Sequence, residues 1–261
     1  MKSEADRGFL ILARVSEWIG IILTFTVPVL VLGLVQADVS TPFAWLTIAV
    51  AMVFGYVASD LLSGMVHWAG DRWGSEKTFM LGPTIVKPFR DHHRDQLEIT
   101  RHNFVETNGN NCLISLWVGC ICIFMPLQVE GYESVLLFMM VSLGSMIFWV
   151  MMTNQFHKWS HEDENKLSGF VKFLQRSHLI LPIAHHGVHH TPPFDRYYNI
   201  TTGWLNWPLA KIGFYRNLEK LVTLTTGLIP RADDIGLDAA IKIAPVVAAP
   251  ETQPHPNPTR S

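Results

Sequence analysis

The chain has 261 residues, of which 49% are hydrophobic and 16% charged, with a net charge of -2 and a mean hydropathy of +0.22. This composition excludes extended disorder, a collagen-like repeat and a disulfide scaffold, and the near-zero charge gives no electrostatic footprint for nucleic acid. The three cysteines, Cys112, Cys120 and Cys122, fall in one apolar run, so neither a disulfide framework nor a CxxC zinc site is available. Histidine is unusually frequent and concentrated, because 11 of the 12 lie between His67 and His190.

Four long apolar stretches predict helices that cross a bilayer. They cover about residues 18–37, 43–66, 111–129 and 134–154. A helix rises about 1.5 Å per residue, so runs of about 20 residues match the roughly 30 Å hydrocarbon core. A soluble all-helical protein with buried hairpins is the alternative, and four separate runs of this length disfavour it. We therefore expect an all-α integral membrane protein with four transmembrane helices and a cytosolic, histidine-rich helical cap.

The basic residues are distributed asymmetrically around these stretches. Of the 20 Lys and Arg residues, three precede the first stretch, six lie between the second and third, and 11 follow the fourth. By the positive-inside rule, both termini and the histidines are cytosolic, in a bacterial inner membrane or the endoplasmic reticulum. We expect one domain over residues 1–230 and a C-terminal extension over 231–261, which is Pro-rich and disordered from residue 245.

The histidines occur at spacings that place several on one helix face. His67 and Asp71 are four residues apart, as are His157 and His161, and HHGVHH contains an HxxHH pattern. Neighbouring turns of a helix bring such side chains within reach of one ion. A single histidine is more often structural, and we give His178 that interpretation. So many histidines in spaced pairs predict metal binding.

The type of metal follows from the donor atoms. Imidazole suits Zn, Cu, Fe and Ni, and the absence of nearby cysteine excludes thiolate zinc and iron–sulfur sites. The number of histidines favours two ions, each with an open position. Two nitrogen-ligated irons can bind O₂ between them and oxidise an unactivated C–H bond, and a lipid chain is the substrate that the membrane offers.

Three segments carry a resemblance to a known family. DHHRDQLEITRHNFVETNGNN, NQFHKWSH and HHGVHHTPPFDRYYNITTGWLN resemble the Kua and CarF-type family of plasmanylethanolamine desaturases, over about residues 55–217. The resemblance implies an O₂-dependent di-iron enzyme that introduces the vinyl ether double bond of plasmalogens into 1-O-alkyl ether phospholipids. The metal ligands that it implies are His67, His92, His93, His102, His157, His161, His186, His189 and His190, with His185 a weaker candidate.

Two further residues are candidates for supporting the metals. Asp71 can accept the second N–H of a ligating imidazole, and Asn154 can orient a metal-bound water. A helix-end salt bridge with Arg72 or Arg94 is the alternative for Asp71. A related plastid branch acts on an acyl chain and tends to lack the counterparts of His102 and ETNG, so their presence here favours the ether-lipid branch.

The chain has no flavin, haem or iron–sulfur motif, so two electrons must come from an external donor. A cytochrome b5-like or ferredoxin-like partner is implied, and basic residues such as Arg90, Arg94, Arg101 and Lys158 can attract its acidic surface or contact lipid phosphate. Acyl-chain desaturation and hydroxylation remain open alternatives. A metal transporter is disfavoured because the spans are almost free of ionisable residues, and a structural zinc protein needs fewer histidines.

Overall fold

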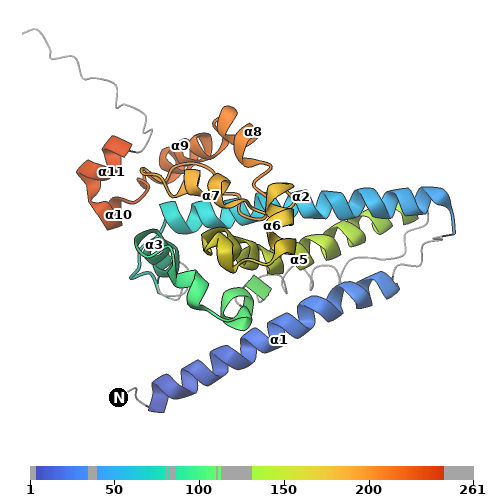
Figure 1. Cartoon of the computed structure of the whole chain (residues 1–261). Helices are drawn as coiled ribbons and strands as arrows, with labels where there is room; N and C mark the ends of the chain where they lie inside the picture. Colours follow the sequence, from blue (N-terminus) through green and yellow to red (C-terminus); the bar gives the residue numbers. More distant parts are fainter. Residues whose placement is uncertain are drawn as a thin grey trace, which may run out of the picture.

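The structure is a computed structural model, and it describes residues 4–34, 40–79, 82, 86–109, 111–112 and 131–243. Within these ranges the chain is helical and contains no β-strand. Three long helices form its length: α1 (Glu4–Leu34), α2 (Pro42–Arg72) and α5 (Glu133–His161). Figure 1 shows α2 lying along α5, with α1 beside them.

Helix α2 begins at a local sequence signal. The Thr41 side chain accepts a hydrogen bond from the Ala44 N–H at 3.2 Å, and Pro42 occupies the first helical position, where its missing N–H costs nothing. Small residues then let α5 approach closely. Ala51 is fully buried against Leu137 and Val141 of α5.

Helices α2 and α5 are the two in the described part of the chain that are long and apolar enough to cross a membrane. Their outer faces stay uncovered, since Trp45 and Phe54 of α2 are 61% and 55% exposed and Val135 of α5 is 52% exposed. A soluble protein rarely leaves such large apolar patches in water, whereas a lipid environment accepts them. The predicted spans 43–66 and 134–154 therefore coincide with helices of the expected kind.

The other two predicted spans are only partly covered by the structure. Span 18–37 falls in α1 as far as Leu34, and residues 35–37 lie outside the described residues. Span 111–129 lies outside them from residue 113 onward. The structure therefore supports two of the four predicted spans, and the other two stay predictions.

Both apolar helices continue well beyond the length that a bilayer needs. With 31 and 29 residues, α2 and α5 are about 46 and 44 Å long, against a roughly 30 Å hydrocarbon core. Their last turns carry the histidines. Short helices surround these ends (Figure 1): α3 (Lys87–Arg94), η2 (Glu98–Arg101), η3 (Glu164–Lys166), α6 (Gly169–Arg176), α7 (Ile183–His189), α8 (Asn206–Lys211), α9 (Phe214–Thr226), α10 (Ala232–Ile235) and α11 (Leu237–Ile243).

The loop between α7 and α8 is fixed to α2 by one buried carboxylate. Oδ1 of Asp60 accepts hydrogen bonds from the backbone N–H groups of Thr201, Thr202 and Gly203 at 2.8–3.1 Å, and Oδ2 accepts one from Leu205 at 3.2 Å. Asp60 is fully buried. A carboxylate that accepts several backbone N–H bonds is strongly stabilised, so this residue positions the chain that follows α7.

Helix α9 covers the end of α2 through a buried ion pair. Arg72 Nε donates to Glu219 Oε1 at 2.6 Å, and Trp68 Nε1 donates to the same oxygen at 3.2 Å. The Arg231 N–H in turn donates to the Arg72 carbonyl at 3.0 Å. The predicted domain boundary at residue 230 stays a prediction, and residues 244–261, including the predicted disordered tail, lie outside the described part.

Candidate metal centre

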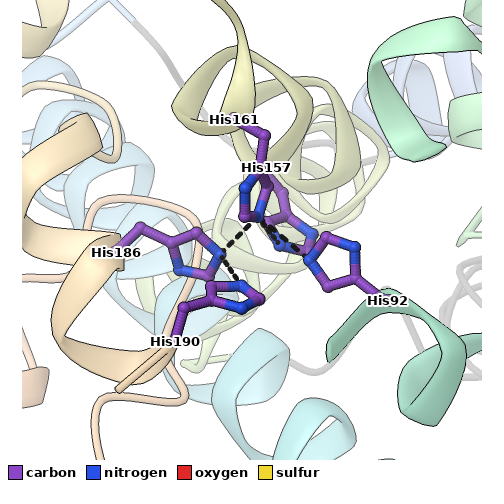
Figure 2. Close-up of side chains that lie close together, drawn as sticks. All are labelled: His92, His157, His161, His186 and His190. Atoms are coloured by element: carbon purple, nitrogen blue, oxygen red, sulfur yellow. Dashed lines mark hydrogen bonds between the residues drawn. The ribbon is translucent and has the colours of Figure 1, made fainter. Parts of the chain in front are cut away.

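One group of histidines brings five imidazoles together from three helices. Their Nε2 atoms face a common point (Figure 2), and their ligand atoms lie within 4.8 Å of one another. The members of this five-histidine group are His92 of α3, His157 and His161 of α5, and His186 and His190 at the end of α7.

The spacing of these nitrogens matches that of ligands around one ion. Nε2 of His161 lies 3.0, 3.2 and 2.9 Å from Nε2 of His92, His157 and His186, and the Nε2 atoms of His186 and His190 are 2.9 Å apart. Two imidazole nitrogens that bind one ion at about 2.1 Å and at right angles are about 3.0 Å apart. The group therefore has the dimensions of a coordination sphere.

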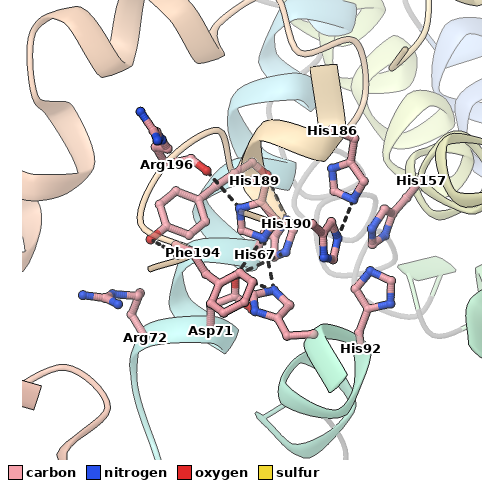
Figure 3. A network of polar contacts seen from close by, with 12 residues as sticks. His67, Asp71, Arg72, His92, His157, His186, His189, His190, Phe194 and Arg196 are labelled. Atoms are coloured by element: carbon pink, nitrogen blue, oxygen red, sulfur yellow. Dashed lines mark hydrogen bonds and ion pairs between the residues drawn. The ribbon is translucent and has the colours of Figure 1, made fainter. Parts of the chain in front are cut away.

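A second group lies beside the first and contains one carboxylate. It consists of His67 and Asp71 of α2, His93 of α3 and His189 of α7. Oδ2 of Asp71 lies 3.3 Å from Nε2 of both His67 and His189, and 3.5 Å from Nε2 of His93. Figure 3 shows His67 and His189 beside Asp71. His67 and His189 are fully buried, and Asp71 is 4% exposed.

Hydrogen bonds at the far side of two rings set the tautomers in this aspartate group. Nδ1 of His67 lies 3.0 Å from the Tyr198 carbonyl, and Nδ1 of His189 lies 2.9 Å from the Arg196 carbonyl. A carbonyl can only accept, so both Nδ1 atoms carry the proton, and in the neutral rings the Nε2 lone pairs point at the Asp71 carboxylate.

This arrangement is suited to a bound cation. Nε2 of His67 and both carboxylate oxygens of Asp71 are buried without a hydrogen-bond partner in the described part of the chain. The two lone pairs and the carboxylate all carry negative charge density toward the same point, so they repel one another. A metal ion supplies the missing positive charge, so the residues present fit a bound metal.

Burial keeps three of the histidines outside the two long helices neutral: His92, His186 and His190. Burial and, to a lesser extent, the neighbouring His161 lower the pKa of His92 to about 2. Burial also lowers the pKa values of His186 and His190, with smaller contributions from nearby histidines. Neutral imidazole is the form that binds metals, so these side chains are prepared for coordination.

Comparison with known proteins agrees with this centre. The family model for the lipid desaturase domain matches residues 56–233, which include every member of both groups. The chain belongs to the lipid desaturase family. It is therefore an oxidoreductase that introduces a double bond into a lipid.

Several named desaturases are similar to this chain in sequence. Plasmanylethanolamine desaturase of Myxococcus xanthus is 53% identical over 211 residues, which are 80% of this chain and 72% of the relative. Plasmanylethanolamine desaturase 1 of Mus musculus is 41% identical over 234 residues, 88% of this chain and 84% of the relative. Fatty acid desaturase 4-like 2, chloroplastic, of Arabidopsis thaliana is 30% identical over 188 residues, 72% of this chain and 64% of the relative. No solved structure gives a significant match.

Nine histidines are predicted as metal ligands. The structure brings eight of them into the two groups. His102 lies outside both. It follows η2, its backbone carbonyl accepts a hydrogen bond from Lys158 Nζ, and it lines a cavity beside His92 and His157. His185 also stands apart, with its ring stacked on Tyr197 at 4.9 Å between ring centroids.

The structure gives the two predicted supporting residues different positions. Asp71 is a member of a candidate metal-binding group, with its carboxylate facing three imidazole nitrogens, so it could act as a ligand itself. In the sequence, the spacing of His67 and Asp71 by one helical turn already indicated that the two side chains share a helix face. Asn154 lies outside both groups, and its Nδ2 donates to the Thr107 carbonyl at 2.9 Å. The backbone carbonyls of Tyr198 and Arg196, which accept hydrogen bonds from His67 and His189, could not be predicted from the sequence, because every residue has a backbone carbonyl.

In the described part of the chain, two cavities border the centre and a third lies close to it. The largest, of about 410 Å³, borders the five-histidine group at His92 and His157. A smaller one between α2 and α5 is lined mainly by apolar side chains. A third, of about 120 Å³, borders the aspartate group at Asp71 and His93 and is otherwise lined by Phe194 and four arginines: Arg72, Arg90, Arg94 and Arg231.

Proposed function

We propose that this lipid desaturase uses two iron ions and O₂ to form the vinyl ether bond of plasmalogens, acting on the 1-O-alkyl chain of an ether phospholipid. The observation that supports it best is the pair of adjoining metal-binding groups in a chain 53% identical to a protein named plasmanylethanolamine desaturase. The ether substrate comes from the names of that relative and of the mouse relative.

The five-histidine group would hold one iron and the aspartate group the other. Imidazole and carboxylate ligands both suit iron, and no cysteine belongs to either group. When bound, the iron pair supplies the oxidising power by reducing O₂. The chain's own residues fix the two ions side by side and exclude water, since most of the ligands are buried.

The reaction balances only with an external reductant. One C–H bond breaks at each of the first two carbons of the alkyl chain, and a double bond forms between these two carbons. The substrate loses two electrons and two protons. Reduction of O₂ to two waters takes four electrons and four protons, so a donor protein must supply two electrons and solvent two protons.

The arginine-lined cavity supports an acidic electron donor of the cytochrome b5 or ferredoxin type. Arg90 and Arg94 both line it, close to Asp71 and His93 of the aspartate group. Arg94, whose side chain is 60% exposed, would attract a donor with an acidic surface and bring it close to the metals.

We further propose that the protein crosses the membrane four times, with both termini and the metal centre in the cytosol. The two helices long enough to span carry their histidines at the same end of the pair, and the positive-inside rule assigns that end to the cytosol.

Two residues outside the metal-binding groups belong to the proposed site. His102 and Asn154 line the large cavity together with His92 and His157, where a substrate carbon would approach the five-histidine group. Asn154 would orient a bound molecule there rather than bind the metal. For His102 the cavity position favours contact with substrate over ligation, although the resemblance implied ligation.

Lipid mass spectrometry tests the proposal. Cells that contain alkyl ether lipids but no plasmalogens are given either this protein or its His157→Ala variant. Acid-labile vinyl ethers that appear with the unchanged protein alone would support it. A new double bond in acyl chains would instead favour the alternative that the relatives named fatty acid desaturase represent.

A further inference from the structure

Two of the cavities share lining residues near the metal centre, and only the larger of the two is lined by charged side chains. The large cavity is bordered by charged residues of α3 and η2, among them Lys87, Asp91 and Glu98. The smaller cavity lies between α2 and α5 and is lined mainly by apolar side chains such as Leu62, Val66 and Val150. These belong to the two helices that are apolar enough to span a membrane.

Phe89 and Asn154 line both cavities and so mark their junction. The junction also lies beside metal ligands on two sides. The Phe89 ring is 5.2 Å from the His67 ring between centroids, and Asn154 precedes His157 by one helical turn. The charged part of the lining therefore ends beside the five-histidine group.

An ether phospholipid has a matching change of polarity at the bond that reacts. Its charged headgroup and glycerol end at the ether oxygen, and the alkyl chain starts at the next carbon. An enzyme that oxidises the first two carbons must hold the boundary between these parts at its oxidant. An acyl-chain desaturase acting far along a chain would need its metals deep beside an apolar tunnel.

We propose that the two cavities form one lipid-binding site, with the headgroup in the large cavity, the start of the alkyl chain between α2 and α5, and the ether linkage at Phe89 and Asn154. This inference rests on the proposed function, because it takes the ether lipid as the substrate. It adds the residues that select the lipid and place the first two carbons beside the five-histidine group.

Glu98 is the residue we assign to headgroup recognition. The other carboxylates of the large cavity are already paired: Asp91 with Lys87 and Arg94, and Glu106 with Arg14. Glu98 has no side-chain partner in the part of the chain that the structure describes, and it is exposed. An ammonium group of ethanolamine in the cavity would pair with it.

The chain-binding part is tested by Leu62→Trp, which fills the smaller cavity. Leu61→Trp is the matched control, because Leu61 neighbours Leu62 on α2 but is exposed and outside the cavity. Binding of a short-chain 1-O-alkyl glycerophosphoethanolamine to the iron-free protein is measured by native mass spectrometry. We expect Leu62→Trp to weaken binding at least tenfold and Leu61→Trp to leave it unchanged. Equal binding by all three proteins would overturn the proposal.

The headgroup part is tested by Glu98→Gln. Affinity for the ethanolamine lipid should fall about two- to fivefold, as expected for loss of an exposed ion pair. Affinity for the same alkyl lipid with a glycerol headgroup, which has no ammonium, should not change. An equal loss for both lipids, or no loss for either, would contradict the role of Glu98.

A measurement on the unchanged protein covers the case in which Leu62→Trp fails to fold. An alkyl lipid with a diazirine near the ether end is photolysed on the iron-free protein, and the labelled peptides are mapped. Labels at residues 62–66 or 150–154 support the site, and labels confined to the exposed face around Trp45 and Phe54 overturn it. None of these readouts needs turnover. Normal binding without vinyl ether formation would therefore count against the proposed function and not against the lipid site.

Discussion

Nδ1 of His67 donates a hydrogen bond to the backbone carbonyl of Tyr198 across 3.0 Å. These two residues are 131 positions apart in the chain, and the bond fixes the ring so that Nε2 faces Asp71. The segment around Tyr198 is itself held to α2 by Asp60, two turns before His67. One helix thus supplies two members of the aspartate group and the anchor for the loop that orients one of them.

The role of Asp71 as a ligand predicts a defined loss of metal. Asp71→Asn removes the only carboxylate of the two groups, so iron binding at the aspartate group should weaken, and the iron content should fall from about two to about one per chain. Iron is counted by elemental analysis of the purified protein. Glu164→Gln, an exposed carboxylate elsewhere, is the control and should retain both ions. A full iron content in Asp71→Asn would show that the carboxylate is no ligand.

His102 and His157 are predicted to behave differently. His157→Gln removes a member of the five-histidine group and should lower the iron content and abolish turnover. His102→Gln should keep the full iron content, because His102 lies outside both groups, while its activity falls through altered contacts in the cavity. Loss of iron in His102→Gln to the same extent would place that residue among the ligands, as the resemblance implies.

Loss of the Asp60 carboxylate should destabilise the fold. Asp60→Ala would leave four backbone N–H groups of the loop without their acceptor, at a cost of about 3 kcal/mol or more. Thermal unfolding in detergent should show a clearly lowered midpoint. Asp238→Ala, at an exposed position of α11, should melt like the unchanged protein. A normal midpoint for Asp60→Ala would mean that the loop is held by other contacts.

The iron-free protein should lose stability as the pH falls from about 6.5. The folded-state pKa of His92 is lowered to about 2, and those of His186 and His190 are lowered as well. Below the unfolded value of about 6.5 the unfolded chain therefore binds protons that the folded chain does not. The free energy of unfolding should fall by up to about 1.4 kcal/mol per pH unit for each such histidine.

Unfolding midpoints of the iron-free protein at pH 7.5, 6.5 and 5.5 check this prediction. The midpoint should drop mainly between the last two values, and His92→Gln should show a shallower drop. A midpoint that does not change over this range would contradict neutral, buried histidines.

The sequence alone predicted the helical class, two of the spans and most of the side chains that the structure brings into the two candidate groups, and the reason lies in local periodicity. Pairs such as His157 and His161, or His67 and Asp71, are one turn apart, so helical spacing alone places each pair on one face. The sequence also shows His92 and His93 as a cluster, but adjacent positions do not share a helix face, and only the resemblance implied that both are ligands.

The sequence could not assign the ligands to separate ions. His92 joins the five-histidine group and His93 the aspartate group, and His189 and His190 divide in the opposite order. Adjacent residues of a helix point about 100° apart, so this division follows from helix geometry once α3 and α7 are placed against α2 and α5. Their placement depends on long-range contacts, such as those of Asp60, that no local pattern reveals.

The most direct test of the account is a single turnover of purified, iron-loaded protein. The protein is reduced without O₂, given a 1-O-alkyl phosphoethanolamine lipid deuterated at the first two alkyl carbons, and then exposed to O₂. Two ferrous ions supply the two electrons required, so we predict up to one vinyl ether per pair of irons, with one deuterium lost from each labelled carbon, and no product from His157→Ala. A hydroxylated lipid, a double bond elsewhere in the chain, or product formed without iron would contradict the account.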